Sequence, residues 1–120
     1  MNTILIVLQV TVALGILNVW LLRSGRATPY RGRDAKTLRE EFAAYGLPFW
    51  VMVVVGVLKV GLALALLAAL WLPALLRPAA VSLGLLMLGA IVVHLLVKDP
   101  IIKALPALAM LTMCVGMALV

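Results

Sequence analysis

The sequence contains few of the residues from which proteins build metal and covalent-catalytic sites. Among 120 residues there are one cysteine, one histidine and four acidic residues. With Cys114 as the only cysteine, an intramolecular disulfide and a thiolate metal cluster are excluded. With His94 as the only histidine, we expect no metal site and no cofactor bound by this chain alone, because haem and metal sites usually need several such ligands.

Charged residues are also scarce, at 12% of the chain, whereas 67% of the residues are hydrophobic. This composition lies far outside the range of soluble domains. Four apolar runs approach or exceed the length of about 20 residues that a helix needs to cross a bilayer. The runs cover residues 4–22, 47–72, 79–97 and 104–120. Because they do not alternate as barrel strands do, residues 1–120 are predicted to form one all-α membrane domain, a four-transmembrane-helix bundle.

The few basic residues are distributed unevenly between the predicted loops. Eight lie in the first and third loops, at positions 23, 26, 31, 33, 36, 39, 98 and 103, against Arg77 alone in the second. By the positive-inside rule, loops 23–46 and 98–103 face the cytoplasm and both termini face outward. We expect the first loop to lie on lipid headgroups, including anionic ones, and we expect no nucleic acid as a partner.

A short interfacial helix is predicted at residues 38–45, between the first two spans. Thr37 and Glu40 have the spacing of a capping box, in which each side chain bonds a free amide at the helix start. Gly46 is suited to a left-handed residue at the helix end, and Pro48 to the first turn of the next span.

Lys59 is the one charged residue at the centre of the second apolar run. A lysine at this depth costs about 2.5 to 3.5 kcal/mol on insertion scales. At 1.5 Å per residue it lies about 18 Å beyond Leu47, too deep for its amine to reach the near interface easily. Lys59 therefore needs polar neighbours in the bundle, or it must lose its proton. It could bind a ligand, or it could be a packing residue whose amine bonds backbone carbonyls and water.

Further polar residues are expected to surround Lys59 in a funnel that opens to the cytoplasm. Thr11 approaches the level of Lys59, and a shallower cluster of Asn18, His94 and Asp99 is expected close to the interfacial helix. On that helix the period places Glu41 beside Tyr45 on the buried flank, although both of its acids could instead be solvated surface groups. The expected cavity residues are Lys59, His94, Asn18, Glu41, Tyr45, Asp99 and Thr11.

Several of these residues also carry a resemblance to a known family. The run Tyr45-Gly-Leu-Pro-Phe-Trp, the lysine-containing run that begins at Gly56, and His94 with Asp99 just beyond it resemble the DoxX-like family of small four-span membrane proteins. The similarity extends from about Tyr45 to Val120. It implies a four-helix bundle with Lys59 and His94 at polar family positions, in a bacterial cytoplasmic membrane. Some relatives are similar to a membrane subunit of thiosulfate:quinone oxidoreductase, which implies a quinone as a possible ligand.

Three functions are compatible with these features. We favour a non-catalytic accessory subunit that binds another membrane protein or a second copy of itself, because one chain offers no complete catalytic set and no catalytic residue can be assigned. The alternative is a quinone- or lipid-binding oxidoreductase component with a cavity around Lys59 and His94. A small transporter is the least expected, because no span carries the carboxylate that couples substrate to protons.

Overall fold

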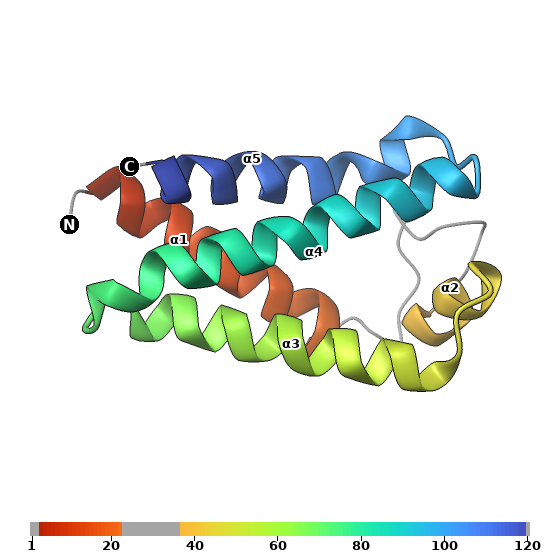
Figure 1. The fold of residues 1–120 in the computed structure, drawn as a ribbon, viewed down its shortest axis with the longest axis horizontal. Coiled ribbons are helices and arrows are strands. Elements are labelled where there is room, and N and C mark those ends of the chain that lie inside the picture. The colour runs from red at the N-terminus through yellow and green to blue at the C-terminus, as the bar shows by residue number, and fades with distance from the viewer. Residues whose placement is uncertain (1–2, 23–36, 120) are drawn as a thin grey trace.

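The computed structural model describes residues 3–22 and 37–119 (Figure 1). The basic segment 23–36, which is predicted to lie on lipid headgroups, falls outside the described residues. Every regular element of the described part is helical. In chain order the elements are α1 (Thr3–Leu17), the π-helical η1 (Asn18–Leu22), α2 (Leu38–Ala44), α3 (Phe49–Ala68), η3 (Pro73–Leu75), α4 (Leu76–Leu96), η4 (Ile101–Ala104) and α5 (Leu105–Leu119).

Four helical segments of the described residues are long and apolar enough to cross a membrane, which confirms the predicted fold class. They are Thr3–Leu22, Phe49–Ala68, Pro73–Leu96 and Ile101–Leu119. The start of α1, the end of α5 and η3 lie at one end of the bundle, and α2 and η4 lie at the other (Figure 1). The described part of the first loop, residues 37–46, therefore shares an end with the third loop, as the basic residues predicted. The long axis of 40 Å matches the thickness of a bilayer with its interfaces, about 40 to 45 Å.

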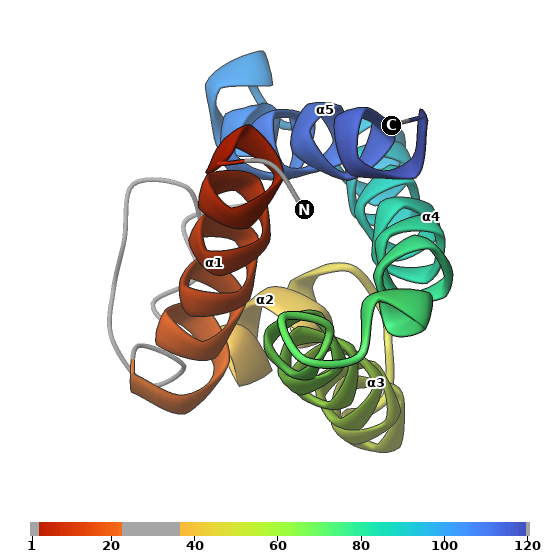
Figure 2. The same cartoon turned by 90° about the vertical axis from the view of Figure 1, so that its left-hand side faces the viewer.

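The core is built from small and medium side chains in the centre of the ring of helices α1, α3, α4 and α5 (Figure 2). Alanines on α1, α3 and α4 are fully or almost fully buried, which lets the helix backbones approach closely. Cys114 is 1% exposed and packs in this core. Many large aliphatic side chains point outward instead, as expected for helices whose solvent is lipid.

Gln9 is a buried polar residue of α1 that the sequence reasoning did not single out. Its Nε2 donates a hydrogen bond of 2.9 Å to the carbonyl oxygen of Leu66 in the last turn of α3. Carbonyls in a last turn lack partners within the helix, and Ala65, Leu67 and Ala68 accept bonds from later backbone amides. Gln9 thus satisfies the end of α3 and links the first span to the second.

The boundaries of α2 follow the local sequence. The Thr37 hydroxyl accepts a 3.1 Å bond from the Glu40 amide, which is one half of the predicted capping box. Gly46 has φ of +77°, the left-handed conformation expected at the helix end. Pro48 precedes α3 as its N-cap instead of lying within its first turn. This tight α2–α3 connection holds α2 beside the start of the second span.

Candidate functional site

A cavity of about 650 Å³ lies in the half of the bundle next to α2. This volume is in the range of small-molecule sites, about 300 to 1,000 Å³. Most of its wall is apolar, from α1, α3, α4 and α5. The polar side chains that line it are Asn18, Glu41, Tyr45, Lys59, His94 and Lys103. An apolar cavity with a few convergent polar groups is typical of a site for a small organic ligand.

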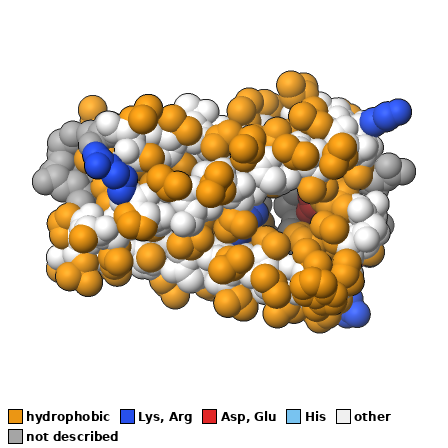
Figure 3. Space-filling view, in the orientation of Figure 1, with side chains coloured by type: hydrophobic (Ala, Val, Ile, Leu, Met, Phe, Trp, Pro, Cys, Tyr) orange, Lys and Arg blue, Asp and Glu red, His pale blue; other side chains and the backbone are white. Residues whose placement is uncertain are grey.

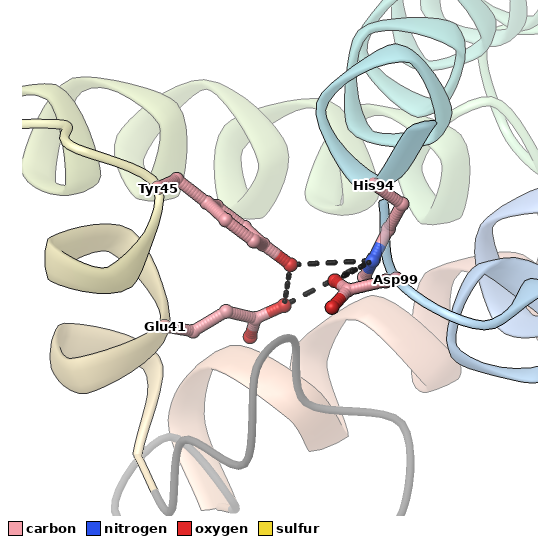
Figure 4. Close-up of polar contacts among 4 residues, drawn as sticks. All are labelled: Glu41, Tyr45, His94 and Asp99. Carbon is pink, nitrogen blue, oxygen red and sulfur yellow. Dashed lines mark hydrogen bonds and ion pairs between the residues drawn. The ribbon is translucent and has the colours of Figure 1, made fainter. Parts of the chain in front are cut away.

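Four side chains from three parts of the chain form a connected polar cluster at this end of the cavity (Figure 4). The Tyr45 hydroxyl donates to Glu41 Oε1 at 2.8 Å and lies 3.2 Å from His94 Nδ1. His94 Nδ1 lies 2.9 Å from Asp99 Oδ2, and His94 Nε2 lies 4.0 Å from Glu41 Oε1. His94 is thereby flanked by two carboxylates and a phenol.

The partners of His94 determine which of its nitrogens carries a hydrogen. The Asp99 carboxylate can only accept, and the Tyr45 hydroxyl gives its hydrogen to Glu41. Nδ1 therefore carries the hydrogen and donates it to Asp99, by assignment from the hydrogen-bond network. In neutral His94, Nε2 is then an acceptor, and in protonated His94 it is a donor. The cluster can exchange one proton at Nε2 while Asp99 holds the ring in place.

Asp99 reaches His94 because of the backbone that ends α4. The Asp99 amide bonds the His94 carbonyl and the Lys98 amide bonds the Leu95 carbonyl, which is the Schellman pattern. Its left-handed position is usually glycine, yet here Lys98 occupies it with φ of +60°. This conformation costs roughly 1 to 2 kcal/mol for a residue with a Cβ. The strained residue lies directly beside the acid that orients His94.

Tyr45 is held in its neutral form. Burial raises the pKa of Tyr45 above its usual value of 10.0, and the nearby carboxylates Glu41 and Asp99 raise it further. The Tyr45 ring also packs edge-on against the His94 ring, with centroids 5.7 Å apart. Tyr45 therefore keeps its hydroxyl hydrogen at ordinary pH and donates it to Glu41, while its contacts with His94 link α2 to α4.

Lys59 points into the bundle, where its amine lies 5.6 Å from the centre of the Trp20 ring, a cation–π distance. Glu41 also interacts with Lys59 electrostatically. The Trp20 ring packs on Gly56, where a Cβ would come within 2.8 Å of it, and meets the Phe42 ring edge-on at 6.1 Å. Gly56 thus makes room for the Trp20 ring.

The structure brings together six of the seven predicted cavity residues. Asn18, Glu41, Tyr45, Lys59 and His94 line the cavity, and Asp99 bonds His94. Thr11 is a correction, because it is exposed on the outer face of α1 and is not part of the cavity wall. The buried face of α1 consists of Leu5, Gln9, Val12, Ala13 and Ile16, so the helix is rotated away from the predicted orientation.

The mouth of the cavity also differs from the predicted funnel. The end that was expected to open is lined by Glu41, Phe42 and Tyr45 of α2. A hollow instead opens sideways on the face formed by α3 and α4, and basic and acidic side chains are visible inside it (Figure 3). The backbones of the two helices are close together near η3 and farther apart toward α2 (Figure 1).

Trp20, Lys103 and Met110 also line the cavity, although none of them was among the residues predicted for it. Trp20 lies near the end of an apolar run, a position where aromatic residues usually mark the membrane interface. The π-helical turn of Asn18–Leu22 gives no sequence signal, although such turns are frequent at functional sites. Lys103 was used only to predict the orientation of the third loop. Residues 3–22 and 37–119 contain no group of three or more His, Cys, Asp or Glu side chains placed to hold a metal ion.

Comparison with known proteins identifies a family. The sequence profile of the DoxX-like family matches residues 7–117, which is nearly the whole chain. No match was found among curated proteins or among solved structures.

Proposed function

This chain belongs to the DoxX-like family of membrane proteins, and from that premise we propose that it binds a membrane quinone or a similar small lipophile in the cavity beside α2. The observation that carries the proposal is that Lys59, His94 and Tyr45 all line one mostly apolar cavity of about 650 Å³. A quinone ring has the same character, with a flat apolar body and carbonyl oxygens that accept hydrogen bonds.

The residues present fit such a ligand. Lys59 offers N–H donors and positive charge at a depth where water is scarce, so its interaction with a carbonyl oxygen is strengthened. His94 offers Nε2 as a group that can exchange a proton with the ligand. Asp99 holds the His94 ring in position through its contact with Nδ1. The aliphatic wall from α3 and α4 would cover the ring and exclude water.

A bound quinone would supply reversible uptake of electrons and protons at its carbonyl oxygens. The part of this chain would be to hold the ring and to pass a proton through His94 Nε2. Glu41 Oε1 lies 4.0 Å from that nitrogen and would receive the proton on the α2 side. With one cysteine and one histidine in the chain, electrons would come from a partner protein.

This proposal modifies the role that the sequence favoured. An accessory subunit that holds a ligand for a redox partner would use both the cavity and the outer faces of the bundle. The accessory role and the identity of the partner remain predictions, and proteins that co-purify from native membranes would identify the partner.

The test is thermal protection of the purified protein by tetramethylbenzoquinone. At about a hundredfold excess over Kd, a ligand that binds only the folded state stabilises it by about 2.7 kcal/mol. We expect protection of the wild-type protein and its loss in Lys59→Met, while Lys59→Met without ligand is as stable as wild type or more stable, since a buried charge has been removed.

Arg77→Met is the matched control, because it removes an exposed cation at the start of α4, at the end of the bundle opposite to α2. It should keep full protection. Equal protection of wild type and Lys59→Met would contradict a ligand beside Lys59.

A further inference from the structure

The side opening of the cavity, together with the proposed function, points to how the ligand enters. The hollow seen between α3 and α4 lies on a face covered with hydrophobic side chains (Figure 3). In a spanning helix such a face contacts acyl chains, so the opening leads into the bilayer. A water-soluble ligand would have to cross lipid to use it.

The rims of the opening differ on the two helices. On α3 the cavity is lined at a spacing of four residues by a stripe that begins just before the helix and ends at the lysine: Leu47, Val51, Val55 and Lys59. Residues at this spacing share one helix face. The stripe forms an apolar track from the α2 end to the amine.

On α4 the rim includes a gap in the side-chain surface. Leu85 and Gly89 both line the cavity and are both exposed to the outside, so they lie at its edge. A Cβ added at Gly89 would meet no atom within 4 Å. The space beside Gly89 is therefore open, and a larger side chain there would fill the opening and not the core.

From these observations we infer that the ligand is a tailed amphiphile that enters sideways from the bilayer, with its ring beside Lys59 and His94 and its apolar tail passing out between α3 and α4 over Gly89. This inference rests on the proposed function and adds the ligand class and its route. The cavity holds a ring-sized head, and the tail stays among the acyl chains. Because the tail does not change its surroundings, its placement costs little free energy on binding.

The experiment compares tetramethylbenzoquinone with the same ring carrying a saturated alkyl chain in place of one methyl group. We expect Gly89→Ile to weaken binding of the tailed compound about tenfold or more, because a filled opening forces the tail against a side chain. Binding of the tailless ring should stay within about twofold of wild type, since that ring lies inside the opening. Affinities come from thermal-shift titrations of the protein in lipid nanodiscs.

Gly61→Ile is the matched control. Gly61 is an exposed glycine of α3 that also has no atom within 4 Å of an added Cβ, but it does not line this cavity. It should leave both affinities unchanged. Leu85→Trp, one turn from Gly89 on the same rim, is a second blocking variant in case Gly89→Ile does not fold, and should give the same selective loss.

The outcomes separate the two proposals. If Gly89→Ile and Leu85→Trp weaken binding of both compounds equally, or weaken binding of neither compound, the sideways route is wrong, although the cavity still binds a quinone. If neither compound protects the wild-type protein, the proposed function fails, and the inference fails with it.

Discussion

At the scale of single residues, Tyr45 is the side chain that connects α2 to the spans. It bonds Glu41 on its own helix and contacts His94 on α4, and its ring packs on the imidazole. A residue with two such contacts both stabilises the fold and shapes the end of the cavity. Its neutral phenol is required for the donor role.

We expect Tyr45→Phe to lower the free energy of unfolding by about 1 to 3 kcal/mol at neutral pH, because a partly buried carboxylate loses a donor. The raised pKa of Tyr45 adds a pH dependence. Above the usual tyrosine value of 10.0 the unfolded chain ionises first, so the stability that Tyr45 contributes is fully present below this pH and is lost as the pH rises further. Denaturant titrations in mixed micelles should therefore show the gap between wild type and Tyr45→Phe narrowing above this pH.

Thr112→Val is the control for this comparison. The Thr112 hydroxyl bonds only the Leu108 carbonyl of its own helix among the contacts described, and it is exposed. Its removal should change stability by less than about 0.5 kcal/mol. A gap between wild type and Tyr45→Phe that stayed constant from neutral to strongly alkaline pH would show that the phenol does not stay protonated in the folded state.

At the scale of elements, the end of α4 combines local strain with the position of a site residue. Lys98 accepts a left-handed backbone so that the next residue, Asp99, turns back to His94. Strain of this kind is often found beside functional groups, since relaxed geometry would place them elsewhere.

Lys98→Gly should raise the free energy of unfolding by up to about 1 kcal/mol, because glycine adopts positive φ without a Cβ penalty. Lys98→Ala removes the same charge but keeps the Cβ, and it should give no such gain. Thermal unfolding of the three proteins in one detergent measures the difference. Equal stabilisation by both substitutions would mean that the charge of Lys98, and not its backbone conformation, is unfavourable.

The rotation of each span about its own axis could not be predicted from the sequence. In a soluble helix the apolar stripe marks the buried face, but a span is apolar all round because lipid resembles the core. Thr11 was expected to line the cavity but faces outward, whereas Gln9 faces inward and bonds α3. A hydroxyl can bond its own helix backbone and tolerate lipid, whereas a long amide side chain needs an external partner, so Gln9 was the better indicator.

At the scale of the whole molecule, the remaining prediction concerns orientation in the membrane. The α2 and η4 end includes the described basic residues Arg39, Lys98 and Lys103, and the positive-inside rule predicts that this end faces the cytoplasm. The proposed proton path from His94 toward Glu41 would then lead to the cytoplasmic side.

Single cysteines in a Cys114→Ser background test this orientation without changing any charge. Leu72→Cys, before η3, should react with a membrane-impermeant maleimide on intact cells, whereas Ile101→Cys, at the start of η4, should react only after lysis. Both positions are exposed, at 60% and 74% for the native side chains. The reverse labelling pattern would place α2 and the proposed proton path on the outer side.

The sequence by itself determined the four spans, the shared end of the two basic loops, the capped α2 helix and the membership of five polar residues in one cavity. These follow from length, charge and local backbone preferences, which act within a few residues or through the membrane boundary. Only the tertiary structure decided that Trp20 covers Lys59, that α1 turns Gln9 inward, and that the cavity opens between α3 and α4. The reason is that packing among uniformly apolar helices depends on side-chain shape, and shape complementarity between distant segments leaves no periodic signal in the sequence.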